Sequence, residues 1–406
     1  GIMQPSPGFQ WPGSAKPTPT TRRQWSDGVS EVERKYEVTR RARLFYEASW
    51  YQNISFYLGR QYVNWSFTRG GLYEPKAPSW RVRLACNRIL GPIQAQISRV
   101  VGMRPAFSTM PNSTEEDDRL AARLSEKLLT YLFDKLRVRR KLNNLLLWVS
   151  TCGSAFVKIG WDNEAGEAIR IPRMEDELLS ATNEDGSAMM DETGQPVMLP
   201  NLRQMVGEDG NDLFDEHHEG EVTVDVLSPF DVLPDPGATN MDEARWVIHA
   251  KWMSLDDIRA NYKRGDEVSP ATNADPYGGV TRKLLFDFVT SYSNSSVPSD
   301  IENRALVKEY WEKPTKEHKQ GRLIIASNGI ELHSGPLPYK PGSNPLPFVK
   351  FDDIESPGRF WAQSKIEQMR PLQMSYNRRR SQLVEFANLM AKPKWLVPKG
   401  AGIIDA

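Results

Sequence analysis

The sequence predicts a mixed α+β protein, in which long helices come first, short β-strands fill the middle and another long helix lies near the end. Before residue 153 apolar residues recur every three or four positions, which is the helical period. After Gly153 they alternate with polar residues, as in half-buried strands, and between residues 361 and 391 the helical period returns. Helices and strands segregated along the chain in this way are typical of the α+β class.

The composition excludes several classes of protein. The chain has 406 residues, a length that suggests two or three domains, and its 52 Lys and Arg balance its 52 Asp and Glu. This balance excludes a uniformly basic nucleic-acid binder. Two cysteines, Cys86 and Cys152, exclude a disulfide scaffold and indicate a reducing compartment. No apolar run approaches the roughly 18 residues of a transmembrane helix. The hydrophobic share is 39% with Tyr and without Gly. Counted with Gly in place of Tyr it is about 43%, slightly under the usual range of roughly 45–50%, which fits an elongated or many-subunit protein.

Three helices are expected before residue 153, after a Pro-, Thr- and Gly-rich flexible arm over residues 1–28. The first covers residues 29–58 and ends at Gly59; one face holds Leu44, Ala48, Tyr51, Ser55 and Leu58, and the opposite face holds Arg40, Arg43 and Glu47. The second covers residues 87–101. The third starts at a Ser113–Glu116 capping box and runs to about residue 149, bending near residues 137–141, with the apolar row Leu120, Leu124, Leu128 and Leu132.

Strands are expected at residues 155–161, 222–226, 246–252 and 305–311, and a short helix at residues 254–262. Asn328 and Gly329 separate two further short strands and predict a two-residue hairpin turn. The last helix is expected over residues 361–391, with Pro371 in the first turn of a new segment. Its predicted inward side chains are Ile366, Met369, Tyr376, Leu383, Phe386 and Met390.

Two stretches depart from charge neutrality. Residues 173–219 carry 13 acidic residues and two arginines, a net charge of −11, which predicts an exposed acidic insertion loop. Residues 22–104 carry 15 basic and six acidic residues, a net charge of +9. The neutral total therefore conceals a dipolar layout along the chain.

The chain lacks the phosphate-binding P-loop, the H-E-x-x-H zinc motif and the G-x-S-x-G nucleophile motif. His217 and His218 are interpreted as an exposed pair in the acidic insertion, and His249 as a structural histidine. Four carboxylates between residues 231 and 243 could serve a metal-dependent nuclease if they converged: Asp231, Asp235, Asp242 and Glu243. Their Pro and Gly neighbours favour ordinary turns instead. No metal site or cofactor is predicted.

Basic residues gather in three runs, at residues 40–43, 137–141 and 378–380. Consecutive Arg378, Arg379 and Arg380 span most of a helical turn, so they cannot all point away from a packed partner. They either line a wet channel or pair with acidic groups on another chain.

Seven groups of short motifs follow one another over roughly residues 30–400. They are Phe56–Tyr62, Cys86–Ile89, Gly102–Pro105 with Met110–Pro111, Gly153–Trp161, Ser228–Pro236 with Ala244–Trp246, Val307–Trp311, and Gln373 with Asn377–Arg380 and Ala391–Pro393. In their order and spacing they resemble the portal proteins of tailed bacteriophages, in particular the P22-like podovirus family.

This resemblance implies an elongated portal fold with a wing, stem helices and a clip, and without the C-terminal crown. A flexible arm over 1–28 would precede a wing over 29–253. The wing would be helical over 29–150 and β-rich over 151–253, with the acidic insertion at 173–219. After it would come a first stem helix and connection over 254–300, a clip over 301–352, a second stem helix over 353–393 and the start of a tunnel loop over 394–406. The clip hairpin would turn at Asn328 and Gly329.

The resemblance also implies a structural protein and not an enzyme: a ring of twelve copies at one capsid vertex of the virion, assembled in the host cytoplasm. Double-stranded DNA would pass through it during packaging and ejection, and its partners would be the major capsid and scaffold proteins, the terminase large subunit and tail adaptors, with no membrane. Residues implied to face DNA or the next subunit are Arg378, Arg379, Arg380, Lys392 and Lys394. The alternatives are the nuclease and a monomeric scaffold or binding module.

Overall fold

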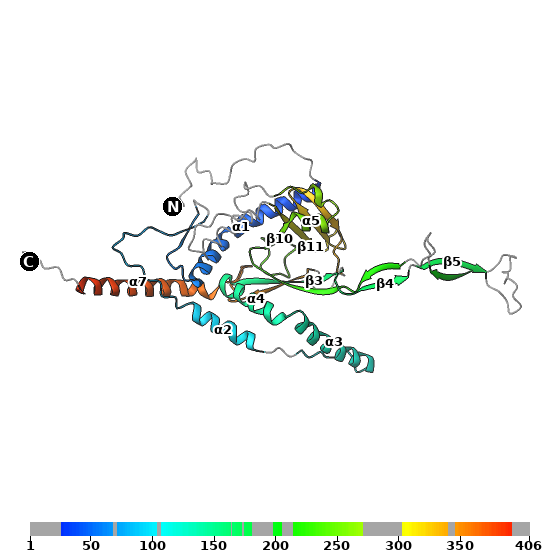
Figure 1. Cartoon of the computed structure of the whole chain (residues 1–406), viewed down its shortest axis with the longest axis horizontal. Helices are drawn as coiled ribbons and strands as arrows, with labels where there is room; N and C mark the ends of the chain where they lie inside the picture. Colours follow the sequence, from blue (N-terminus) through cyan, green and yellow to red (C-terminus); the bar gives the residue numbers. More distant parts are fainter. Residues whose placement is uncertain are drawn as a thin grey trace, which may run out of the picture. The chain divides into compact units, whose positions relative to one another are not determined.

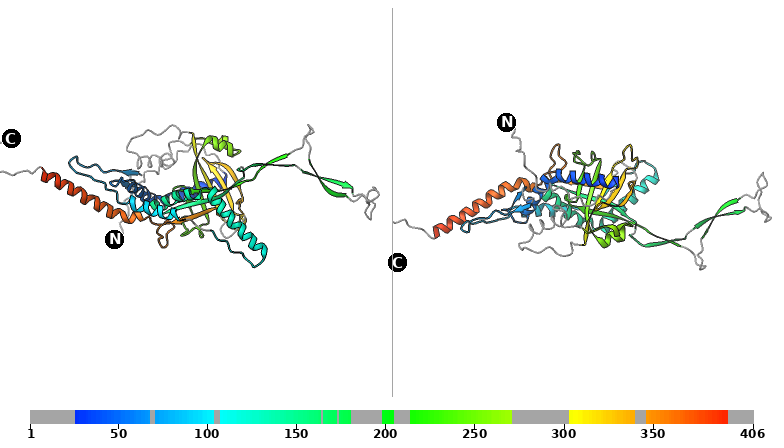
Figure 2. Two further views of the ribbon diagram at one scale, coloured as in Figure 1. Left: turned by 60° about the horizontal axis from the view of Figure 1, so that its bottom comes forward. Right: turned by 90° about the horizontal axis from the view of Figure 1, so that it is seen from above.

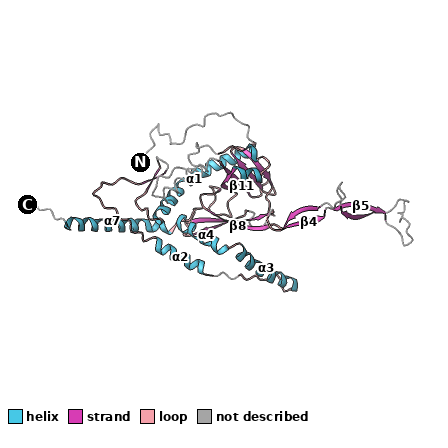
Figure 3. Ribbon diagram, in the orientation of Figure 1, coloured by secondary structure: helices cyan, strands magenta, loops and turns pink. Residues whose placement is uncertain are grey.

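The computed structural model describes residues 26–67, 71–103, 107–163, 165–172, 174–180, 198–204, 214–270, 303–339 and 346–391, and of residues 170–217 the backbone alone. The chain divides into two compact units, residues 1–158 with 225–406, and residues 159–224. Helices and strands are both present, as the α+β prediction requires (Figure 3). The predicted arm lies outside the described residues except for its last three positions.

The first helix, α1 (Asp27–Tyr57), matches its predicted range. Ser26 caps it by accepting a hydrogen bond from the Val29 N–H at 3.4 Å, and Gly59 follows it at φ 90°. Arg43, on the face opposite the predicted apolar row, is buried. Its guanidinium donates to the carbonyls of Pro229 at 3.0 Å and Val232 at 2.7 Å, so a charged side chain ties α1 to the loop beside the sheet.

Helix α2 (Leu90–Gly102) begins three residues later than predicted. The cause is Asn87, whose Oδ1 accepts from the N–H groups of Ile89 at 3.1 Å and Leu90 at 3.3 Å and so caps the helix from outside.

The predicted bend in the third helix is a break between α3 (Glu116–Lys135) and α4 (Val138–Cys152). Arg137 between them adopts a left-handed conformation at φ 50°. Ser113 caps the N–H of Glu115 at 3.2 Å, so the predicted capping box with Glu116 does not form. Helix α4 has a buried face, whereas α3 has no buried residue. The predicted leucine row on α3 therefore faces outward.

A five-stranded antiparallel sheet in the order β13-β12-β11-β10-β9 forms the centre of the larger unit. Its strands are β9 (Val232–Pro234), β10 (Trp246–Ser254), β11 (Arg304–Glu312), β12 (Arg322–Ser327) and β13 (Ile330–Gly335). Helix α1 packs on it through β9 and β12 (Figure 1). The predicted strands 246–252 and 305–311 lie side by side at its centre, with Ile248 opposite Tyr310.

The Asn328-Gly329 turn is confirmed between β12 and β13, where both residues have positive φ, 49° and 81°. The short helix α5 (Leu255–Asn261) is also confirmed, capped by Ser254, and a 3₁₀ turn follows at Gly265–Glu267. Leu255 and Ile258 of α5 are buried against this sheet. One sheet therefore contains strands from two of the predicted domain ranges. Strand β10 lies in the range expected to be the wing, and β11–β13 lie in the range expected to be the clip.

A three-stranded sheet has the order β14-β3-β8, from β3 (Ser154–Asp162), β8 (Glu221–Leu227) and β14 (Phe348–Asp352). A two-stranded sheet pairs β1 (Asn64–Ser66) with β2 (Gly71–Tyr73). The main core lies between α1, α4, β3 and the five-stranded sheet and is rich in aromatic rings. Trp50, for example, meets Phe230 edge-on at 5.1 Å and Trp361 at 4.9 Å between ring centroids.

Gly153, between α4 and β3, has φ 89°, and a Cβ there would lie 2.3 Å from the carbonyl oxygen of Ala362. Gly153→Ala is therefore expected to lower the free energy of unfolding by about 2 kcal/mol, because both the backbone conformation and the contact oppose a side chain. Gly91→Ala in α2, where a Cβ meets nothing within 4 Å, is the matched control and should be neutral or slightly stabilising. Equal urea midpoints for the two variants would contradict this assignment.

The smaller unit corrects the expectation of an acidic loop. Its backbone forms two antiparallel ribbons: β4 (Ala168–Pro172) pairs with β7 (Phe214–His218), and β5 (Met174–Ser180) pairs with β6 (Met198–Gln204). The sequence prediction failed because the high acidity of this stretch masked the strand pattern, and because backbone pairing in a two-stranded ribbon needs no apolar alternation in the sequence. His217 and His218 lie in β7.

The last helix, α7 (Lys365–Ala391), is continuous, as two further views show (Figure 2). It begins after Ser364, whose Oγ accepts from the N–H of Ile366 at 3.0 Å. The expectation for Pro371 was wrong: it lies inside the helix, at the seventh residue. Contacts on the preceding turn hold the helix together across the hydrogen bond that proline cannot donate; they include the burial of Ile366 and the hydrogen bond of half-buried Arg370 to Gln52.

Candidate functional site

Helix α7 carries the three arginines that the sequence singled out. Arg378, Arg379 and Arg380 are all exposed. Because consecutive residues of a helix are separated by about 100°, they point in three directions around α7. Lys392 and Lys394, predicted with them, lie outside the described residues.

The buried face of α7 is polar, which corrects the predicted inward side chains. Of the predicted set only Ile366 is buried, whereas Leu383, Phe386 and Met390 are 59%, 61% and 64% exposed. Three polar residues spaced by four take the inward positions in the middle of the helix: Gln373, Asn377 and Ser381.

These side chains hold a chain segment, residues 82–88, along α7. Backbone N–H groups at alternate positions of the segment donate to side chains four residues apart on the helix. The pairs are Val82 with Glu385 (2.9 Å), Leu84 with Ser381 (3.0 Å), Cys86 with Asn377 (3.1 Å) and Arg88 with Gln373 (3.0 Å). Four helical residues rise about 6 Å and two extended residues advance about 6.6 Å, so the two repeats stay in register. We call these four bonds the polar ladder.

The polar ladder joins a buried network around Gln61. The amide of Asn377 donates to Gln61 Oε1 at 2.5 Å, and Gln61 in turn donates to Asn87 Oδ1 at 3.2 Å. Gln373 donates to the Cys86 carbonyl at 2.7 Å and to Asn377 Oδ1 at 2.9 Å. The cap of α2, the end of α1 and the middle of α7 are thereby fixed to one another.

A second polar contact joins α1 to the first turns of α7. Arg370 donates to Gln52 Oε1 at 2.6 Å, and Ser49 donates to Glu367 Oε1 at 2.9 Å. Burial lowers the pKa of Arg370, which the nearby charge of Glu367 partly offsets. Specific hydrogen bonds therefore set the direction in which α7 leaves the body of the larger unit.

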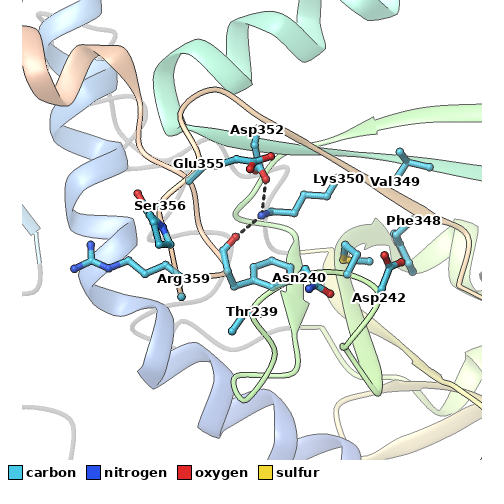
Figure 4. Close-up of a pocket in the computed structure, with 15 residues that line it drawn as sticks. Thr239, Asn240, Asp242, Phe348, Val349, Lys350, Asp352, Glu355, Ser356 and Arg359 are labelled. Carbon is cyan, nitrogen blue, oxygen red and sulfur yellow. Dashed lines mark hydrogen bonds and ion pairs between the residues drawn. The ribbon is translucent and has the colours of Figure 1, made fainter.

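A pocket of about 670 Å³ lies between β14 and the 239–242 loop (Figure 4). Lys350 within it donates to Asp352 at 2.7 Å and to the carbonyl of Phe360, so its ammonium group is already engaged. Asp242, one of the four carboxylates considered for a nuclease, lines this pocket.

The other three carboxylates are engaged in local turns. Asp235 accepts hydrogen bonds from Arg245 at 2.8 Å and from the N–H of Gly237 at 3.1 Å. Burial raises the pKa of Asp235, but the two hydrogen bonds lower it by more, so the pKa lies below its usual range. Asp231 accepts from Ser228 at 2.6 Å, and Glu243 accepts from Thr239 at 2.6 Å. Over the described part of the chain, no three His, Cys, Asp or Glu side chains form a group that could hold a metal ion. These contacts are turn chemistry, as their Pro and Gly neighbours indicate.

A concentrated cluster of charged side chains lies in the interior of the larger unit, around Glu309. Glu309 is buried on β11 and contacts Lys158 at 2.5 Å, Lys251 at 3.1 Å and His249 at 3.1 Å. His249 is thus the structural histidine that the sequence predicts. Burial raises the pKa of Glu309, but the His249 hydrogen bond and the surrounding positive charges lower it more, to well below its usual range.

None of the helices in the described residues combines the length and apolar character needed to cross a bilayer. No curated protein matches the chain significantly. A family model described as phage SU10 portal protein matches residues 92–406. This range begins inside α2, extends beyond α7 and includes the three-stranded sheet with β3 and the five-stranded sheet with β11. The match confirms the portal resemblance read from the motifs, and it shows that this chain belongs to the phage SU10 portal protein family.

Proposed function

We propose that this phage portal protein forms a ring of twelve copies at one vertex of the capsid, through which double-stranded DNA is packaged and later ejected. The family match is the observation that carries this proposal. The proposed role is structural: three of the four carboxylates that a nuclease would need, Asp231, Asp235 and Glu243, serve in local turns, and hydrolysis of ATP would be left to a separate terminase motor.

A closed ring of identical subunits uses heterologous contacts, so each subunit must present two different adhesive surfaces. Two helices of this chain present apolar side chains to solvent. The exposed apolar side chains are Leu120, Leu124, Leu128 and Tyr131 on α3, and Leu383, Phe386 and Met390 on α7. Exposed apolar surface of this kind is typical of an assembling protein.

The charge of the chain suits passage of DNA better than retention of it. Duplex DNA carries one negative charge per about 1.7 Å of its axis, so a strongly basic lumen would grip it. This chain has no net charge. We propose that Arg378–Arg380 and, further along, Lys392 and Lys394 supply sparse positive charge that faces either the lumen or the neighbouring subunit.

The domain ranges given above remain proposals. In that arrangement the hairpin at Asn328 and Gly329 belongs to a clip that meets the terminase large subunit and later the tail adaptors, and the wing meets capsid and scaffold proteins. The virion, after assembly in the host cytoplasm, would be the place of action.

The test is the oligomeric state of the purified chain, by mass photometry and negative-stain imaging over a hundredfold range of concentration. Rings with a central hole of at least about 20 Å, the width of a duplex, are expected. A monomer at every concentration would contradict the proposal. The Asp235→Ala variant should form the same rings, because this residue acts in a local turn.

A further inference from the structure

Helix α3 is packed on one side only. Phe107 contacts Phe133 at 5.6 Å between ring centroids, and Thr109 hydrogen-bonds the carbonyl of Ala122, so the preceding segment covers one face. At about 100° per residue, the opposite face holds Asp117, Leu120, Leu124, Leu128 and Tyr131. The four apolar side chains of this face are 51–66% exposed.

This exposure is unusual for a helix of 20 residues. Helices of globular proteins gain most of their stability from an apolar face that packs on something else, and a short helix alone is marginal in water. Since α3 has no buried residue, its leucine face is expected to be covered in the working protein. The next question is what covers it.

Helix α7 presents a second uncovered face, opposite the polar ladder. Arg379, Leu383, Phe386 and Met390 lie on it, at successive spacings of four, three and four residues. This is the spacing of a two-helix seam, in which alternate a and d positions meet a partner helix. All four side chains are exposed.

The two faces match in spacing and in charge. On α3 the residues Asp117, Ala121, Leu124 and Leu128 follow the same four, three and four spacing. If the helices run parallel, Asp117 meets Arg379, and the apolar residues that follow meet one another in order. Glu115, Glu116 and Asp118 then surround the arginine run, so the acidic first turn of α3 faces the basic turn of α7.

We propose that α3 of one subunit packs in parallel against α7 of the next subunit, with Asp117 opposite Arg379 and Leu128 opposite Met390. The proposal rests on the ring proposed above and deepens it by naming the two surfaces that close it. The occupant is a second copy of this chain because both faces are exposed within one copy and complement each other. Arg379 is then a contact residue between subunits and not a DNA-facing one.

Charge reversal tests the pairing in the whole chain. Arg379→Glu and Asp117→Arg each place like charges in the seam, so each alone is expected to raise the concentration for half-assembly by about tenfold. Mixed together, the two variants restore opposite charges at every interface. They should form rings that contain both variants in equal number, measured by native mass spectrometry with one variant tagged.

Lys319→Glu is the matched control, because it makes the same reversal of an exposed positive charge in the loop between β11 and β12, outside both helices. It should assemble like the wild type. If Lys319→Glu impairs assembly as much as Arg379→Glu, or if the mixture forms no rings, the proposed pairing is wrong.

Disulfide trapping tests the register independently. In a Cys86→Ser background, Ala121→Cys with Leu383→Cys should yield a ladder of covalent dimers and higher species on oxidation. Leu128→Cys with Leu383→Cys, about two turns out of register, should not. A ladder from the second pair alone would mean an antiparallel or shifted seam and would overturn the proposal.

The failure of this pairing can be told from the failure of the ring. Rings in the wild type without trapping by the first cysteine pair would refute the α3–α7 contact and leave the ring intact. Absence of both rings and trapping would refute both proposals. Trapping within a single chain, seen as a faster-migrating monomer, would show that α3 and α7 of the same copy meet and would also overturn the contact.

Discussion

Replacing Glu309 by Gln is expected to lower the free energy of unfolding by about 3–5 kcal/mol, the usual cost of removing one partner from a buried ion pair. Its carboxylate neutralises Lys158 and Lys251 and accepts hydrogen bonds from His249 and from Trp311 Nε1 at 3.4 Å. The neutral amide of Gln leaves two ammonium groups without a counter-charge beside the central sheet. Because β11 is a middle strand of that sheet, the loss should affect the whole larger unit.

The effect should depend on pH in a defined direction. The pKa of Glu309 is lower in the folded protein than its ordinary value of 4.5, so the carboxylate binds a proton more readily in the unfolded chain. The contribution of the Glu309 carboxylate to the free energy of unfolding is therefore complete above about pH 5 and is lost as pH falls below 4.5 toward the pKa of the folded state. The stability difference between wild type and Glu309→Gln should shrink over that acidic range.

Urea unfolding of the two proteins between pH 3.5 and 7.5 provides the measurement. The matched control is Glu317→Gln, which removes an exposed carboxylate between β11 and β12 and should change stability by less than about 0.5 kcal/mol. A Glu309→Gln variant as stable as this control at pH 7 would show that the buried cluster contributes nothing net.

Replacing Asn377 by Leu is expected to cost about 3 kcal/mol and to release the segment that α7 holds. The leucine is similar in size, but it leaves the N–H of Cys86 and the side-chain oxygen of Gln61 without their partners in a buried place. Each such group costs about 1–3 kcal/mol when it loses its hydrogen bond. The polar ladder is the main link between residues 82–88 and the helix. The substitution should therefore release this segment from α7 before it unfolds the larger unit as a whole.

Limited trypsin digestion reads out the local effect, because Arg81, Arg83 and Arg88 lie in or beside the held segment. Cleavage at these three sites should accelerate at least about tenfold, corresponding to about 1.4 kcal/mol of lost local stability. Asn388→Leu, an exposed position on the same helix, is the control and should digest like the wild type. Unchanged cleavage in Asn377→Leu would mean that other contacts hold the segment.

Local patterns predicted most of the secondary structure. The helical range 29–58, the strands around residues 246–252 and 305–311, the capped helix after Ser254 and the Asn328-Gly329 turn all agree with the structure. These features depend on periodicity, capping and turn chemistry, which act over a few residues and are therefore visible in one sequence. Helix boundaries shifted where a side chain outside the helix capped it, as Asn87 and Ser364 do.

The direction in which each helix faces was predicted less well. On α7 the sequence contains a polar stripe, Gln373, Asn377 and Ser381, at the same spacing that an apolar core face would have. The apolar stripe of α7 is the predicted inward face because burial of apolar surface is the general rule. The rule failed here because the neighbour of α7 is an irregular backbone segment, whose N–H groups need hydrogen-bond acceptors.

By itself, the sequence determined the class of fold, the long helices, the two central strands and the portal family, since each follows from short-range patterns or from the order of motifs along the chain. Only the tertiary structure decided which faces are covered: it buried Arg43, joined Glu309 to two lysines and left the leucines of α3 and the apolar stripe of α7 exposed. The physical reason is that a side chain's environment depends on residues hundreds of positions away, as when Asn377 meets Cys86, and no local period encodes that pairing.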